Sequence, residues 1–369
     1  MKFSTPVIKK NQPDDNYKFL PLPQPSGQYP YRLSLEKIKP IVSDTQLVFH
    51  LVGDTGGLLN PSFQRLVSEE MTRQYRNCPD LEAQPQFLYH LGDLVYHHGE
   101  ASQYAKQFFT PYKNYPGPIF AIAGNHDSDV NLLCQEPYQS LDAFKTVFCD
   151  TESRPVSFSS GSARNSMIQP NIYWTLETPV ATIIGLHSNV PKFGVITEEQ
   201  RAWFVAELKA AAGLRTEKAL IVCLHHAPYS ADVNHGSSVA MIEFLEGVFE
   251  ETGIRPDLVL SGHVHNYQRF SKQYKDGKAL TFIVCGSGGF DELHSIADLE
   301  DDRFTNESPL FDQVSLQKAF TANNGFLKLS IKRGEEGLSI NGYYYIIPHD
   351  AEMEDMPVAS LSDHFSILC

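Results

Sequence analysis

The sequence lacks several features that would assign it to common classes of protein. No run of about 18 apolar residues is present, so no membrane-spanning helix is expected. The first residues contain no apolar central stretch of the kind found in secretory signals. Basic residues are also few: 30 Lys and Arg face 44 Asp and Glu, which gives a net charge of −14. Such a surface repels phosphate backbones and anionic lipids, so we expect neither nucleic acid nor a membrane as a bulk partner.

Cysteine is sparse as well. The six cysteines are scattered and form no Cys-x-x-Cys pair, so a thiolate zinc site is not indicated. Cys223 and Cys285 lie within apolar segments and are expected to be buried free thiols. A disulfide between Cys134 and Cys149 stays open as an alternative. This usage fits a reducing compartment, and we therefore expect a cytoplasmic protein.

What the sequence does contain is a series of apolar segments of strand length. Several of them are apolar at nearly every position, which is typical of strands covered on both faces. A later segment, residues 326–347, alternates instead and turns at 334–337, so it is expected to form an antiparallel hairpin. The apolar segments occupy residues 48–53, 87–92, 118–124, 180–186, 219–224, 257–262 and 281–286.

Helical patterns lie between these strands. Asn60 can cap the first of them. Thr197 and Gln200 have the spacing of a capping box for the second, which Gly213 would end. A third helical pattern ends at Gly253. Strands that alternate with helices predict an α/β fold, and the hairpin adds mixed β-sheets, so we expect a two-sheet β-sandwich flanked by helices.

The chain is expected to contain one domain with a short extension at each end. Residues 1–45 are rich in proline and polar groups and are predicted to form an irregular N-terminal arm. No linker divides residues 46–348, which we assign to a single domain. Residues 349–369 are predicted to form a C-terminal tail.

Five of the apolar segments end in residues that can bind a metal ion. In open α/β sheets, functional groups gather beyond the carboxyl ends of the strands, so these residues are expected to converge at one edge. Each motif alone is compatible with a turn or an ordinary pair of histidines, whereas the five together are a strong signal. Carboxylate, amide and imidazole ligands suit iron, zinc or manganese, and there are enough of them for two ions. The residues are Asp54, Asp93, Asn125 with His126 and Asp127, His225 with His226, and His263 with His265.

Five short motifs resemble, in the same order, the five motif blocks of the metallophosphoesterase (calcineurin-like) superfamily, and within it the purple acid phosphatase-like branch. They are GDTG, GDLVY, GNHD, VCLH and GHVH. The similarity spans residues 48–290. It implies the metallophosphoesterase fold, with four layers in the order α/β/β/α, and a binuclear metal centre. It further implies that one ion is held by Asp54, Asp93, Tyr96 and His265 and the other by Asp93, Asn125, His225 and His263, with Asp93 bridging.

Tyr96 sets this chain apart from most of the superfamily. Most members have Asp-x-His in the first block, but here Gly56 stands at the histidine position. Tyr96 resembles the replacement ligand, although an aromatic residue here, taken alone, would be interpreted as a packing residue. A trivalent cation would remove the phenol proton well below its usual pKa of about 10, and a phenolate ligand implies Fe(III). The second ion is expected to be iron, zinc or manganese.

The resemblance implies a hydrolase for phosphate monoesters, in which a metal-bound hydroxide attacks the phosphorus of a small phosphoester. His126 is implied to contact the phosphate, and Asp127 to orient His126. His235, ten residues after His225, is assigned to the leaving group from its spacing alone. A phosphodiesterase, for example for cyclic nucleotides, is the alternative, and a metal-binding scaffold without turnover is a further one.

Other polar residues near these motifs have less specific interpretations. His97 and His98 are expected to be exposed loop residues, and His187 to be a structural residue. His226 either supports the ligands or points away from them. Arg269 either meets the phosphate or forms a surface salt bridge.

Overall fold

The computed structural model describes the whole chain except residues 60, 336 and 349–357. Asn60, the expected helix cap, and part of the predicted tail therefore lie outside the described residues. All six cysteines are described and are free thiols, so the alternative disulfide between Cys134 and Cys149 is not formed. None of the described helices is both long and apolar enough to cross a lipid bilayer. The cytoplasmic location that the cysteine usage indicates stays a prediction.

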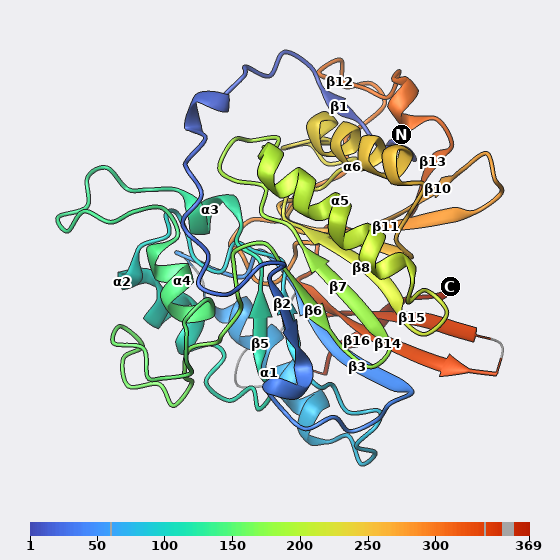
Figure 1. Cartoon of the computed structure of the whole chain (residues 1–369). Helices are drawn as coiled ribbons and strands as arrows, with labels where there is room; N and C mark the ends of the chain where they lie inside the picture. The colour runs from blue at the N-terminus through green and yellow to red at the C-terminus, as the bar shows by residue number, and fades with distance from the viewer. Residues whose placement is uncertain (60, 336, 349–357) are drawn as a thin grey trace.

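Two mixed β-sheets form the centre of the protein (Figure 1). The larger sheet has eight strands in the order β13 (Val314–Phe320), β10 (Tyr267–Gln273), β11 (Ala279–Cys285), β9 (Leu258–Ser261), β8 (Ala219–Leu224), β7 (Ala181–Gly185), β6 (Trp174–Glu177) and β2 (Arg32–Ser34). The smaller sheet has six strands in the order β16 (Ser360–Leu368), β15 (Gly337–Ile346), β14 (Gly325–Gly334), β3 (Gln46–Val52), β4 (Leu88–His90) and β5 (Ile119–Ala121). A separate two-stranded ribbon joins β1 (Ile8–Lys9) to β12 (Phe304–Thr305).

The apolar segments of the sequence account for the parallel part of each sheet, and the predicted fold class is confirmed. Strands β3, β4 and β5 run parallel to one another, and so do β7, β8, β9 and β11. The predicted hairpin is the antiparallel pair β14 and β15. Strand β8 is buried along its whole length, as expected for a strand covered on both faces.

Helices cover the outer faces of the sheets (Figure 1). The long ones are α1 (Ser62–Arg76), α5 (Glu198–Ala212) and α6 (Val239–Thr252), and the short ones are α2 (Ala101–Tyr104), α3 (Asn125–Ser128) and α4 (Asp142–Phe148). Further helical turns lie at Asn16–Lys18, Leu35–Lys37, Ala105–Phe109 and Pro309–Phe311. Because α5 packs on β7, β8 contacts β15, and α1 packs on β14, the layers follow the order α/β/β/α.

The start of α5 is only partly as the sequence predicts. Thr197 Oγ1 accepts a hydrogen bond from Gln200 N at 3.2 Å, so Thr197 is the cap. The other half of the capping box is replaced, because the Gln200 side chain binds the backbone N–H and carbonyl of His187, both at 2.8 Å. This clamp ties α5 to the loop after β7. As predicted, α5 ends before Gly213 and α6 ends before Gly253, whose φ is +68°.

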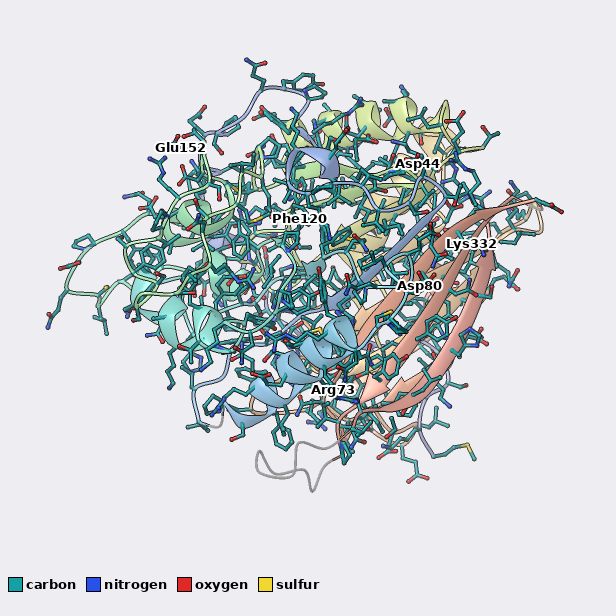
Figure 2. All side chains as sticks on the ribbon, turned by 90° about the horizontal axis from the view of Figure 1, so that it is seen from below. Asp44, Arg73, Asp80, Phe120, Glu152 and Lys332 are labelled. Atoms are coloured by element: carbon teal, nitrogen blue, oxygen red, sulfur yellow. The ribbon has the colours of Figure 1, made fainter. Side chains whose placement is uncertain are left out.

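Aromatic side chains fill the space between the two sheets. Phe120 of β5 packs against Trp174 of β6 with ring centroids 5.6 Å apart. Phe120 lies in the interior in Figure 2, whereas the labelled charged residues Arg73 and Lys332 lie nearer the periphery. Burying a large apolar side chain contributes about 1.5–3 kcal/mol. This core therefore fixes the strands whose ends carry the candidate site.

The predicted arm and tail are more regular than expected. Strand β2, within the arm, pairs with β6 at the edge of the larger sheet. Strand β16, within the tail, pairs with β15 at the edge of the smaller sheet. Both are edge strands of mixed polarity, so their structure depends on partners far away in the sequence rather than on a local apolar run. The domain boundaries after residues 45 and 348 stay predictions.

Candidate metal centre

The candidate site lies where the carboxyl ends of strands from both sheets meet. Backbone hydrogen bonds join these ends, since Asp54 N donates to Gly92 O at 3.0 Å and connects the ends of β3 and β4. Gly53 N donates to Cys285 O at 2.9 Å and links the smaller sheet to the larger one. The residues predicted to bind metal follow these strand ends, and the structure brings them together.

Glycine makes this convergence possible, as Gly92 illustrates. Its φ is +96°, a conformation that favours glycine. A Cβ atom at this position would lie 2.5 Å from Gly124 N and 2.7 Å from His225 Nδ1. A larger residue would push three strand ends apart, so the glycine before Asp93 is a requirement of the site.

The first group of predicted ligands surrounds the phenol oxygen of Tyr96. Tyr96 Oη lies 3.1 Å from Asp93 Oδ2, 3.4 Å from Asp54 Oδ1 and 3.4 Å from His265 Nε2. All four side chains are buried. The phenol oxygen therefore belongs to a polar cluster, and Tyr96 is not simply a packing residue.

The second group surrounds the side-chain oxygen of Asn125. Asn125 Oδ1 lies 2.9 Å from His263 Nδ1 and 3.1 Å from His225 Nε2. His225 Nε2 also lies 3.2 Å from Asp93 Oδ2, the same oxygen that contacts Tyr96. Asp93 thus stands between the two groups, which is the position that a bridging carboxylate would take.

Hydrogen bonds to the protein backbone orient two of the imidazoles. His225 Nδ1 donates to Leu91 O at 2.8 Å, so Nε2 is left facing the site. His265 Nδ1 donates to Glu292 O at 3.1 Å and leaves its Nε2 facing Tyr96. Metal-binding histidines are usually held in this way by their other ring nitrogen. Two carboxylates, a phenol, an amide oxygen and three imidazoles form a donor set that fits a pair of transition-metal ions.

The space beside Gly56 is occupied by the tyrosine. A Cβ atom at position 56 would lie 2.8 Å from Tyr96 Cδ2 and 2.5 Å from Gln107 Oε1. Gln107 also fixes the Tyr96 backbone, since its Oε1 accepts from Tyr96 N at 3.0 Å and its Nε2 donates to Tyr96 O at 2.7 Å. Phe290 packs on the phenol ring with centroids 4.1 Å apart. A side chain at position 56 and this placement of Tyr96 therefore exclude each other.

At three of the predicted ligands, Tyr96, Asp54 and His225, the surrounding protein groups favour the protonated form by raising the pKa. Burial, and then the charges of Asp93 and Asp54, raise the pKa of Tyr96 well above its usual value. Burial also raises the pKa of Asp54. Burial by itself would lower the pKa of His225, but Asp93 and Asp54 together raise it to about 9. A phenolate and a neutral imidazole here would therefore need a cation in place of these protons.

The predicted pairing of Asp127 with His126 is wrong in this structure. Asp127 is fully buried, and it accepts hydrogen bonds from the backbone N–H groups of Leu94, Val95 and Gly124 at 2.8–3.2 Å. It therefore ties the loop after β4 to the loop after β5. His126 is half-buried, and its Nδ1 donates to a backbone carbonyl, that of His97, at 2.7 Å. The Asp127 carboxylate is thus used by backbone N–H groups of two loops and not by the neighbouring imidazole, so adjacency alone gave the wrong partner.

His235 lies beside the second group of ligands, and the structure adds two residues that the sequence analysis missed. The ring centroids of His235 and His263 are 4.1 Å apart. His294 stacks on His265 with centroids 4.4 Å apart, and its Nδ1 lies 3.1 Å from Asp232 Oδ2. Asp232 also accepts from His235 N at 3.2 Å, so one buried carboxylate orients both histidines. The Asp-x-x-His spacing of Asp232 and His235 is the signal that points to this arrangement.

Two further histidines lie behind the ligands. His226 Nδ1 lies 2.7 Å from Ser188 Oγ, and its ring centroid is 4.3 Å from that of His263, so His226 supports the ligands. His187 is buried at the end of β7, where Gln200 holds its backbone. This position agrees with a structural role for His187.

The remaining polar residues lie outside the two groups of ligands. His98 forms a partly exposed ion pair with Asp129 at 3.2 Å. Arg269 forms a salt bridge with Asp363 of β16, with nitrogen–oxygen distances of 2.7 and 3.0 Å. The salt-bridge interpretation of Arg269 is therefore the one that the structure supports.

Comparisons with known proteins bear on the family and the fold of this chain. A family model described as calcineurin-like phosphoesterase matches residues 41–267, which is more than half of the chain. Purple acid phosphatase 21 of Arabidopsis thaliana is 28% identical over 144 residues, which cover 36% of this chain and 32% of that protein. Purple acid phosphatase 22 of the same plant is 29% identical over 148 residues, with the same two coverages, 36% and 32%. The chain thus spans about a third of the length of these relatives.

Two solved structures share the fold. GAP50, described as the anchor in the inner membrane complex of Plasmodium, has a TM-score of 0.55 at 14% identity and covers 88% of this chain and 89% of its own. PhoD has a TM-score of 0.52 at 13% identity and covers 94% of this chain and 71% of its own. At these identities the likeness shows the fold alone, and the predicted metallophosphoesterase fold is confirmed.

Proposed function

Because this chain belongs to the calcineurin-like phosphoesterase family, we propose that it is an enzyme that hydrolyses small phosphate monoesters at a binuclear metal centre. The family and the purple acid phosphatase relatives support a metal-dependent phosphoric ester hydrolase of the purple acid phosphatase-like branch. One observation carries the binuclear part of the proposal. Asp93 Oδ2 lies 3.1 Å from Tyr96 Oη and 3.2 Å from His225 Nε2, between the two groups of ligands.

The donor chemistry of each group favours particular ions. The phenol of Tyr96 favours Fe(III), and the imidazole and amide donors of the other group suit iron, zinc or manganese. When bound, two such ions would supply Lewis-acid polarisation of the phosphoryl group and acidify water at mild pH. We assign the first ion to Asp54, Asp93, Tyr96 and His265, and the second to Asp93, Asn125, His225 and His263.

Two histidines are assigned to the substrate. His126 Nδ1 donates to the His97 carbonyl, which leaves Nε2 unbound, and a ring that carries protons on both nitrogens can donate from Nε2 to a phosphate oxygen. His235 lies beside His263 and its backbone N–H is held by Asp232, so its ring is placed to donate a hydrogen bond to the leaving oxygen. The revised role of Asp127 is positioning, because it fixes the loops that carry Asp93 and His126.

The proposal is tested by assaying metal-loaded protein on p-nitrophenyl phosphate and on bis(p-nitrophenyl) phosphate. Asn125→Ala removes a predicted ligand of the second ion, and we expect it to lower both metal content and activity. Asn77→Ala, at an exposed position after α1, is the matched control and should leave both unchanged. Activity on the bis-ester alone would show that the phosphodiesterase alternative is right and that the proposed monoesterase is wrong. If the protein binds two ions but hydrolyses neither ester, the proposed hydrolase activity is contradicted.

A further inference from the structure

The start of the chain packs directly on the loop that carries His235. From here the arm means only residues 1–18 of the predicted N-terminal arm (residues 1–45), and residues 230–237 are named the His235 loop. Phe3 and Val7 of the arm are buried in a small apolar cluster that also contains Ala297 and Phe304, with Val233 of the His235 loop packed against it. Figure 1 shows the N-terminal segment lying beside α6 and β12. The arm is therefore anchored to the body of the protein at the site.

Backbone contacts make the arm a fixed wall of the His235 loop. Val7 N donates to Ser230 O at 2.8 Å, and Ser237 N donates to Val7 O at 2.7 Å, so Val7 is paired with both ends of the loop. Gly236 has a φ of +68°, and a Cβ atom there would lie 3.0 Å from Lys9 N and 3.1 Å from Val7 O. The loop approaches the arm this closely only because residue 236 is glycine.

Asp232 fixes the same loop from inside. Its carboxylate accepts from the backbone N–H groups of Asn234 at 3.0 Å, His235 at 3.2 Å and Gly236 at 2.8 Å. Asp232 Oδ2 also lies 3.1 Å from His294 Nδ1. The position of His235 relative to the arm is therefore set by hydrogen bonds on both sides of the loop.

Two lysines lie next to this loop in a protein whose net charge is −14. Lys9 Nζ donates to Asn234 O, the residue before His235, at 2.8 Å. Lys192, in the loop after β7, contacts the arm through a hydrogen bond from its Nζ to Gln12 Oε1. Both ammonium groups thus contact the arm or the loop on which it packs, and burial, and then the charge of Lys9, lower the pKa of Lys192.

The carboxylates close to these lysines already have partners. Asp15 pairs with Lys18 at 3.2 Å and accepts from Lys192 N at 3.0 Å, and Asp232 is held by His294 and the loop. An ammonium group has three N–H donors, and the hydrogen bond to Asn234 O uses only one of those of Lys9. The pair is thus a local positive feature on the His235 side of the metal ligands.

We propose that Lys9 and Lys192, together with His235, form a subsite for a second phosphate on the leaving group of the substrate. This inference rests on the proposed function and names its substrate class, which is a phosphate ester or anhydride whose leaving group is itself phosphorylated. The phosphate that is cleaved would lie at the metal ligands, and the second would accept hydrogen bonds from the two ammonium groups. The arm, which the sequence alone presents as an irregular extension, supplies Lys9 to this subsite.

The first test compares two substrates in the full-length, metal-loaded protein. The ratio of kcat/KM for inorganic pyrophosphate to kcat/KM for p-nitrophenyl phosphate is measured for wild type and for the Lys9→Gln, Lys192→Gln double variant. We expect the ratio to fall by about tenfold, the effect of losing charge-assisted hydrogen bonds to one phosphate. Lys9→Arg with Lys192→Arg keeps both charges and should keep most of the ratio. Lys209→Gln, on the exposed face of α5, removes the same charge elsewhere and should not change it.

The second test needs no turnover and separates this inference from the proposed function. Calorimetry measures binding of pyrophosphate and of orthophosphate to the same proteins, with metal content and melting temperature as checks on folding. We expect pyrophosphate to bind more tightly in wild type and to lose that advantage in the Gln double variant. If wild type hydrolyses no phosphoester but this loss is seen, the proposed function fails and the subsite stands. If wild type hydrolyses p-nitrophenyl phosphate and the variant changes the ratio by less than about threefold, the subsite fails alone.

Discussion

Replacing Gly56 by alanine tests whether Tyr96 stands where it does because position 56 has no side chain. The new Cβ atom would lie 2.5 Å from Gln107 Oε1, 2.8 Å from Leu94 O and 2.8 Å from Tyr96 Cδ2. Leu94 O belongs to the backbone, and Gln107 is held by two hydrogen bonds to the Tyr96 backbone. None of the three atoms can therefore retreat without breaking another contact.

The size of the effect follows from these contacts. Forcing one extra carbon into a packed region costs about 1–3 kcal/mol. Displacing Gln107 weakens a buried hydrogen bond as well, which costs about 1 kcal/mol more. We expect Gly56→Ala to lower the free energy of unfolding by about 2–4 kcal/mol. The phenol ring should also shift, and with it any absorption that depends on Tyr96 binding iron.

Urea unfolding of wild type and Gly56→Ala, each with a visible spectrum of the iron-loaded form, measures both effects. Gly247→Ala is the matched control, because a Cβ atom at position 247 of α6 would meet nothing within 4 Å. It should leave the spectrum unchanged and be neutral or stabilising by up to about 1 kcal/mol. If Gly56→Ala unfolds within about 0.5 kcal/mol of wild type and keeps its spectrum, the packing argument for Tyr96 is refuted.

Three further outcomes are expected. Asp127→Ala leaves three backbone N–H groups without their acceptor and should lower the free energy of unfolding in urea by about 3 kcal/mol or more, whereas Asp127→Asn keeps an acceptor oxygen and should lose less. Removing metal with a chelator should lower the melting temperature, because ions that bind the folded site stabilise it, and adding iron and zinc should restore it; an unchanged temperature would count against a bound centre. Metal affinity should weaken as pH falls, because the pKa of His225 is raised to about 9 and its imidazole must lose a proton to bind; calorimetry at neutral pH in two buffers should therefore detect proton release, and finding none would contradict this role.

Much of the fold is predictable from local features of the sequence. The apolar segments contain β4, β5, β7, β8 and β9, and all of β3 and β11 except their first two residues, because a strand covered on both faces has no polar side to show. Strands β2 and β16 are harder to predict. Each lies at an edge, and β16 alternates between buried residues such as Asp363 and Phe365 and exposed ones, within a segment that the sequence presents as a tail.

The candidate site divides in the same way. Residues that follow strand ends could be predicted to converge, because the direction of the strands decides where their ends lie. Partners within the site depend on how loops fold, so Asp127 was assigned to the wrong neighbour. His294 lies in an irregular loop and has no strand end before it, so no local pattern indicated that it stacks on His265. Tyr96 was the exception among the partners within the site. Because Gly56 stands where most of the superfamily has a histidine ligand, the missing ligand indicated that Tyr96 replaces it.

The most direct measurement is the visible spectrum and iron content of the oxidised protein, compared between wild type and Tyr96→Phe. Tyr96 Oη lies within 3.4 Å of Asp54, Asp93 and His265, so an iron ion held by these groups would also bind the phenolate. We expect a charge-transfer band in wild type that is lost in Tyr96→Phe, while Asp54, Asp93 and His265 stay in place to retain iron. A band that survives the removal of the phenol oxygen would contradict the assignment of Tyr96 as a ligand.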